Sequence, residues 1–138
     1  MYHKDDTFEG MIGGNKMKVN AKSIDLAKVQ AEAEESYRKG FFCCEAVMEV
    51  IMDNFELDVP HEIIKMASGM AIGVGKSGCI CGALNGGVLA ISMFFGRDEQ
   101  RGPKDPEVVK CMSMTNELHD WFRENNTKKA ACCRVLTR

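Results

Sequence analysis

Residues 79–95 read CICGALNGGVLAISMFF, and this stretch decides the fold. It is the longest apolar run in the chain, and Gly96 follows it directly. Such a run predicts one buried helix from about Cys81 to Phe95 that ends at the glycine. The run is shorter than the roughly 20 apolar residues that a membrane-spanning helix needs, so we expect no membrane span.

Small residues recur every four positions along this predicted helix. Gly82, Gly86 and Ala90 form one strip, and Ala83 and Gly87 form a second strip beside it. Small side chains let another backbone come very close. The pattern therefore predicts tight packing of this helix in the core.

Capping signals on both sides predict four further helices. Ser23 is a favoured N-cap and Gly40 a favoured stop for the first of them. An aspartate followed within two residues by a proline opens a helix well, because the proline suits the first turn. The remaining predicted helices are Phe42 to Asn54, one that opens at residues 58–60, and one that opens at residues 105–106.

Strand signals are weak, because long alternating β-branched runs are absent. We therefore expect an all-α, single-domain bundle of about five helices. A glycine-rich loop at residues 69–78 precedes the fourth helix. Residues 1–20 are expected to form an irregular N-terminal arm, and residues 21–138 the helical domain.

The charge balance bears on the class of partner, and the N-terminal residues bear on the compartment. The 138 residues include 18 Lys and Arg and 20 Asp and Glu, a formal net charge of -2. This balance does not favour nucleic acid as a partner. The polar N-terminus shows no secretory signal, so we expect a cytoplasmic protein.

Seven cysteines are many for an intracellular chain of this length. An odd number leaves one over in any complete set of disulfides. Without a secretory signal, reduced thiols or metal-bound thiolates are expected rather than structural disulfides.

Most of the cysteines are placed where thiolate chemistry is favourable. Cys43 and Cys44 begin the second predicted helix, and Cys79 and Cys81 begin the fourth. The partial positive charge of a helix N-terminus favours the thiolate, which is the form that attacks disulfides and binds metals. Two more cysteines, Cys132 and Cys133, lie in the C-terminal tail.

The spacings alone do not identify a site. Cys-x-x-Cys is absent, so neither a zinc-ribbon nor a thioredoxin-type motif is present. A free cysteine is often a small buried hydrophobic residue, and Cys111, in the middle of a helix, fits that interpretation best.

Three segments together resemble the redox-active protein family called C_GCAxxG_C_C. Residues 40–47, GFFCCEAV, are similar to its Gly-x-x-Cys-x-x-Ala-Val, and residues 81–86, CGALNG, to its Cys-Gly-Ala-x-x-Gly. Residues 133–136, CRVL, are similar to its C-terminal Cys-Arg-x-Leu. A related domain occurs in split-Soret cytochromes c, which the Cys79-x-Cys81 pair also resembles.

The resemblance implies a small helical redox protein and, from the split-Soret relatives, an iron–sulfur cluster. Carried over by position, the site residues are Cys43, Cys81 and Cys133, with Gly82 beside the second. The fourth family cysteine would follow Cys133, where this sequence stops. Cys44, Cys79 and Cys132 each neighbour a matched position and are candidates for the missing ligand.

Three hypotheses follow from the sequence. The first is electron transfer through a cysteine-ligated iron–sulfur cluster. The second is a reversible disulfide between Cys43 and Cys81, and the third is a zinc-stabilised or purely structural helical module. The redox partner is not identified, and a homodimer is a possible way to complete a site that one chain leaves short.

Overall fold

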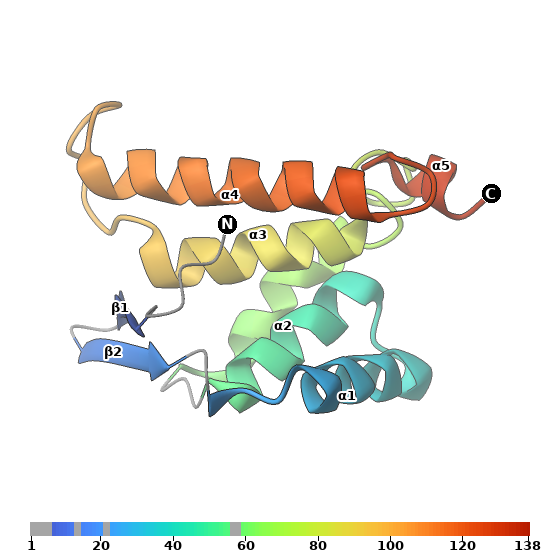
Figure 1. The fold of residues 1–138 in the computed structure, drawn as a ribbon, viewed down its shortest axis with the longest axis horizontal. Coiled ribbons are helices and arrows are strands. Elements are labelled where there is room, and N and C mark those ends of the chain that lie inside the picture. Colours follow the sequence, from blue (N-terminus) through green and yellow to red (C-terminus); the bar gives the residue numbers. More distant parts are fainter. Residues whose placement is uncertain (1–6, 13–14, 21–22, 56–58) are drawn as a thin grey trace.

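The computed structural model describes residues 7–12, 15–20, 23–55 and 59–138. Within these ranges the chain is mostly helical, as the sequence predicted, and it forms one domain (Figure 1). The helices are α1 (Leu26–Lys39), α2 (Cys43–Asn54), the 3₁₀ helix η2 (His61–Met70), α3 (Gly82–Phe95), α4 (Pro106–Asn125) and α5 (Cys133–Leu136).

Most predicted helix ends are confirmed. Gly40 ends α1 with a φ of 124°, Gly96 ends α3, and Asp105 caps α4 by accepting a hydrogen bond from the Glu107 N–H. The start of α1 was predicted wrongly. Its N-cap is Asp25 rather than Ser23, and the Asp25 carboxylate accepts from the Lys28 N–H at 3.1 Å.

Two features of the C-terminal half were not predicted. The helix after Pro60 is a 3₁₀ helix whose N-cap is Pro60 itself, whereas the sequence placed this proline in the first turn after a cap at Asp58, which lies outside the described residues. The C-terminal tail also forms the short helix α5, which the sequence analysis did not predict.

The expected irregular arm contains a two-stranded antiparallel sheet. Strand β1 (Thr7–Ile12) pairs with β2 (Asn15–Asn20), with Thr7 opposite Asn20 and Ile12 opposite Asn15. Gly13-Gly14 stands between the two strands in the sequence. A glycine pair between two strands is a hairpin signal, because glycine accepts the positive φ angles that tight hairpin turns need.

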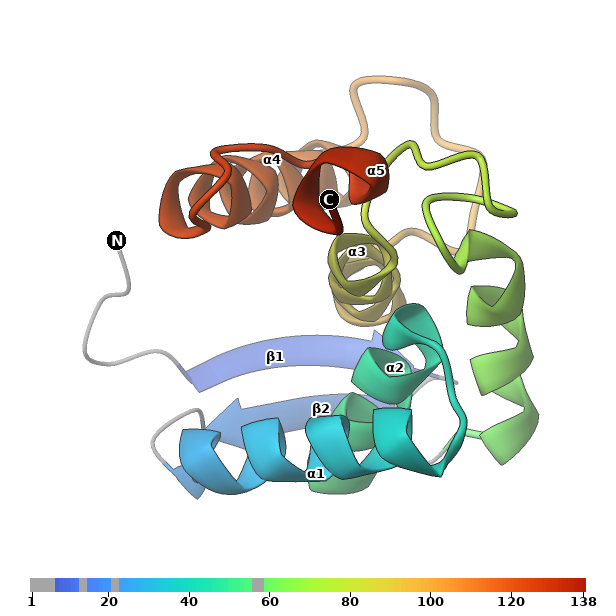
Figure 2. The ribbon, with the colours of Figure 1, turned by 90° about the vertical axis from the view of Figure 1, so that its right-hand side faces the viewer.

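Helix α3 lies between α2 and α4 and packs on both (Figures 1 and 2). A methyl group at Gly86 would come within 2.8 Å of the Cys44 carbonyl oxygen in α2. A methyl group at Gly87 would come within 2.8 Å of the Leu118 side chain in α4. The two small-residue strips therefore face different helices, which confirms the predicted close packing. The main apolar core lies between α2, η2 and α3 and contains Cys44, Met48, Met52, Ile64, Ala67, Ala71 and Ala90.

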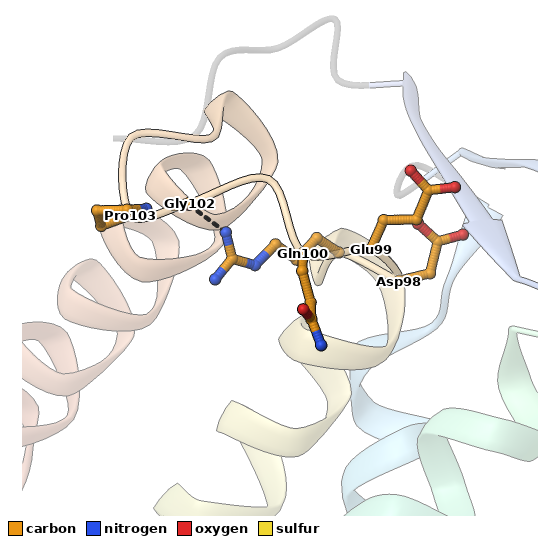
Figure 3. A pocket seen from close by; sticks show the side chains of 6 residues that line it. Asp98, Glu99, Gln100, Gly102 and Pro103 are labelled. Atoms are coloured by element: carbon orange, nitrogen blue, oxygen red, sulfur yellow. Dashed lines mark hydrogen bonds between the residues drawn. The ribbon is translucent and has the colours of Figure 1, made fainter.

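No helix among the described residues is long and apolar enough to cross a bilayer. The linker between α3 and α4 forms a shallow pocket by itself (Figure 3). Within this linker the Arg97 guanidinium donates a hydrogen bond to the Gly102 carbonyl. No cysteine lines this pocket.

Candidate thiol site

Three cysteines stand at the starts of three helices. Cys43 is the first residue of α2, Cys81 is the N-cap of α3, and Cys133 is the first residue of α5. They are the cysteines that the sequence matched to the family pattern. We call them the thiol cluster, because the contacts described below bring them together.

Gly82 joins the first two members of the cluster. A side chain at Gly82 would overlap the Cys43 sulfur, so this sulfur lies directly against the first residue of α3. The residue before Gly82 is Cys81. The absence of a side chain at Gly82 therefore lets the starts of α2 and α3 meet at their cysteines.

Backbone hydrogen bonds join the third member. Ile80 and Cys132 form an isolated antiparallel bridge. On one side of it the Cys81 N–H donates to the Ala131 carbonyl at 2.8 Å, and on the other the Cys133 N–H donates to the Cys79 carbonyl at 2.5 Å. This bridge fixes the C-terminal tail beside the start of α3.

The segment from Ile72 to Lys76 covers Cys133 with an unusual backbone. Its five residues all have φ between 54° and 70°. Such left-handed angles disfavour side chains that branch at Cβ, such as those of Ile72 and Val74. A methyl group at Gly73 would come within 2.8 Å of the Cys133 Cβ, so the turn passes very close to this cysteine.

The electrostatics agree with this proximity. Burial raises the pKa of the Cys133 thiol, and the neighbouring thiols of Cys81 and Cys43 raise the pKa further. The side chain of Cys133 is buried, whereas those of Cys43 and Cys81 are partly exposed. Cys133 therefore lies close to both other thiols, and two of the three side chains have access to solvent.

The other four cysteines are placed differently. Cys44 is fully buried in the core, its thiol donates to the Ala67 carbonyl at 3.0 Å, and burial and then Cys43 raise its pKa. Cys111 is buried beside α3, with its sulfur 3.8 Å from the Ser92 hydroxyl. Cys79 and Cys132 are exposed, and both adjoin the cluster through the backbone.

Two residues of this site have no counterpart in the sequence prediction. Gly73 was seen only as one glycine of a loop, and Arg134 only as part of a matched motif. The Arg134 guanidinium donates to the Ser77 carbonyl, and the Arg134 backbone N–H donates to the Gly78 carbonyl at 3.1 Å. These bonds hold the left-handed turn against α5. The alternation of glycine at positions 73 and 75 was the only available signal.

The thiols are near one another without meeting at a point. No three His, Cys, Asp or Glu side chains in the described part of the chain are arranged to hold a single metal ion. All seven cysteines are unpaired. The donor set at the thiol cluster consists of sulfur alone, which is the set that iron–sulfur clusters take.

Comparison with known proteins gives one match. Residues 41–138 match the family described as "Putative redox-active protein (C_GCAxxG_C_C)". No curated protein and no solved structure matches the chain. The matched range includes all three members of the thiol cluster and the whole left-handed turn.

Proposed function

Because the chain belongs to the C_GCAxxG_C_C family of redox-active proteins, we propose that it transfers electrons through an iron–sulfur cluster held by Cys43, Cys81 and Cys133. The observation that carries this proposal is the proximity of three thiols from three separate segments. Bound there, the cluster would supply a one-electron centre, and the chain would supply its thiolate ligands.

The arrangement of the thiols favours a cluster over a single zinc ion. Four zinc ligands surround one point, with zinc–sulfur distances of about 2.3 Å. A cluster of several iron and sulfide ions is wider, so its thiolates stand further apart. No three ligating side chains in the described part of the chain surround one ion position, so a single zinc ion has no preformed site there.

The register of the tail favours Cys79 as a fourth ligand. Successive side chains of an extended strand point to opposite faces. From this alternation about the Ile80–Cys132 bridge, we expect Cys79, Cys81 and Cys133 to share one face and Cys132 to lie on the other. The exposed Cys79 can then complete the common set of four cysteines, whereas Cys44 is committed to the core.

A specific contact also favours a thiol–disulfide switch as a second candidate. The Cys43 sulfur lies against the residue that follows Cys81. In this reaction the two thiols form one S–S bond, and their two electrons and two protons reduce a partner's disulfide to two thiols. The sulfur that attacks first must be accessible, and both of these side chains are partly exposed.

Metal analysis of the whole chain, purified without oxygen, tests the leading proposal. We expect iron and acid-labile sulfide in matched amounts and a visible absorption band. Cys43→Ala, Cys81→Ala and Cys133→Ala should each lose most of both, whereas Cys111→Ala, a buried control outside the site, should keep them. Cys79→Ala should lower cluster content more than Cys132→Ala does.

The same samples distinguish the second candidate. If iron and sulfide are absent from folded protein, mass spectrometry after treatment with oxidised glutathione should find a Cys43–Cys81 disulfide. Folded protein with neither a cluster nor this disulfide would contradict both proposals.

A further inference from the structure

The two chain segments that contain Cys81 and Cys133 carry lysine and arginine but no aspartate or glutamate. We define the cysteine cap as residues 71–81 and 126–138, which the Ile80–Cys132 bridge holds side by side (Figure 2). The cap contains five of the chain's 18 Lys and Arg and none of its 20 Asp and Glu. The remaining residues contain 13 Lys and Arg against 20 Asp and Glu, and they include Glu45, two residues after Cys43. The five cations are Lys76, Lys128, Lys129, Arg134 and Arg138.

Apolar side chains are exposed on the same two segments. Ile72, Val74, Ile80 and Val135 are between 37% and 50% exposed. The cap therefore combines accessible apolar side chains with positive charge. Recognition surfaces share this combination, because apolar contact gives attraction and charge gives orientation.

The position of the cap links it to the proposed redox chemistry. Cys81 and Cys133 belong to it, and the exposed Cys79 and Cys132 lie at its surface. Electron transfer requires close approach of two redox centres, so a partner must dock where the centre is nearest to solvent. The interfaces of redox proteins are small and weak, and complementary charge raises their association rates.

We propose that the cysteine cap is the docking surface for an acidic redox protein. This inference rests on the proposed function, since it assumes that the thiol cluster carries the exchanged electron. In the complex, acidic side chains of the partner face the five cations, and its apolar centre contacts the four apolar residues of the cap. One electron leaves the partner's reduced flavin or iron centre and reduces the centre at the cap.

The observations favour a protein over the other polyanions. Nucleic acid and anionic lipid surfaces attract positive charge by many phosphate contacts, and the chain as a whole is acidic. The cap is compact, partly apolar and placed at the cysteines. These features suit a small acidic protein surface better than an extended polyanion.

A reduced acidic flavodoxin is the probe for this docking, with the methyl viologen radical cation as a second electron donor. We expect the dissociation constant of the flavodoxin complex to rise about tenfold or more between 20 mM and 200 mM salt, because screening weakens attraction between exposed charges. The double variant Lys76→Asp/Lys128→Glu should weaken binding at 20 mM salt by a similar factor. Lys28→Glu/Lys104→Glu makes the same charge change outside the cap and should bind within about twofold of the unmodified protein.

The two electron donors, flavodoxin and the viologen cation, test the docking surface and the proposed redox centre separately. Reduction by the viologen cation depends on the redox centre alone, so its absence contradicts the proposed function, whatever the binding titration shows. Docking is contradicted if the flavodoxin dissociation constant is unaffected by salt, or if both double variants weaken binding equally. Binding to phosphatidylglycerol vesicles or single-stranded DNA at 150 mM salt, with no flavodoxin complex, would also overturn it.

Discussion

At the scale of single residues, the site depends on a glycine, because a side chain at position 82 would overlap the Cys43 sulfur. Gly82 occupies the first position of α3, and the Cys43 sulfur lies in the space that its side chain would take. The backbone at Gly82 does not require glycine, since its φ is not positive. The small size of this residue therefore matters for the site rather than for the turn.

Gly82→Ala should disrupt the site more than the fold. The nearest atom to the new methyl group is the sulfur of a side chain that can rotate, so Cys43 should turn away. We expect iron content to fall by about half or more, with a modest change in melting temperature. Alkylation of Cys43 by iodoacetamide in the cluster-free protein should become faster.

Gly69→Ala is the matched control, because a methyl group there meets nothing within 4 Å. It should keep the iron content and the alkylation rate of the unmodified protein. Equal loss of iron in both variants would show that the Gly82 contact has no special role.

A second residue-scale prediction concerns the left-handed turn. Gly73 has a φ of 70°, and a methyl group there would also come within 2.6 Å of the Cys79 nitrogen. Both the backbone angle and the space disfavour a side chain. Gly73→Ala should therefore lower both cluster content and melting temperature, unlike Gly82→Ala, which should affect mainly the cluster. An unchanged melting temperature would contradict this account of the turn.

At the scale of elements, the two strips of α3 predict two different costs. At Gly86 a methyl group would approach the backbone of α2, which cannot easily move. At Gly87 it would approach only the end of the Leu118 side chain, which can shift. Urea unfolding should show that Gly86→Ala lowers the free energy of unfolding by about 1–3 kcal/mol and that Gly87→Ala lowers it clearly less. Equal losses would mean that the α2 contact is no tighter than the α4 contact.

The carboxylate of Asp105, which caps the start of α4, should make the free energy of unfolding depend on pH in the acid range. Burial alone would raise the pKa of Asp105, but hydrogen bonds from the Glu107 N–H and Arg101 outweigh burial and hold this pKa below its usual value. The Arg101–Asp105 ion pair spans 2.5 Å. Since the folded pKa lies below the unfolded one, this stabilisation is present above the unfolded pKa and is lost as the pH falls through the folded pKa.

Asp105→Asn keeps a capping oxygen and removes the titration. We expect it to be less stable than the unmodified protein at pH 7, with the difference shrinking between about pH 5 and pH 2. Urea unfolding across this range measures the difference. A constant difference would show that the Asp105 charge does not contribute to the acid dependence.

At the scale of the whole molecule, local signals predicted most helices. Gly40, Gly96 and the Asp105-Pro106 pair act within one turn, so they can be read from the sequence. Helix α5 was missed because four residues carry too little periodicity, and its place depends on bonds to the distant Gly78 and Cys79 carbonyls. The paired strands were missed although Gly13-Gly14 was visible, since an isolated hairpin is marginally stable in water.

The candidate site was predictable in its members but not in its geometry. The motif around Cys43, Cys81 and Cys133 identified the cysteines. Their convergence depends on contacts between residues far apart in sequence, such as the bond from Arg134 to Ser77 across 57 positions. The periodicity of apolar residues does not predict a contact between residues so far apart in the sequence. Cys44 was also a candidate ligand, because it is adjacent to Cys43 in the sequence. In the structure its thiol is buried in the core and donates to the Ala67 carbonyl.

The most direct test of the central claim is iron and acid-labile sulfide content in the whole chain, purified without oxygen, compared with Cys133→Ala and Cys111→Ala. The account predicts matched iron and sulfide in the unmodified protein and in Cys111→Ala, and their loss in Cys133→Ala. Both cysteines are buried, so a general effect of removing a buried thiol would affect both variants equally. Well-folded protein without iron and sulfide, or equal content in both variants, would contradict a cluster held by these three thiols.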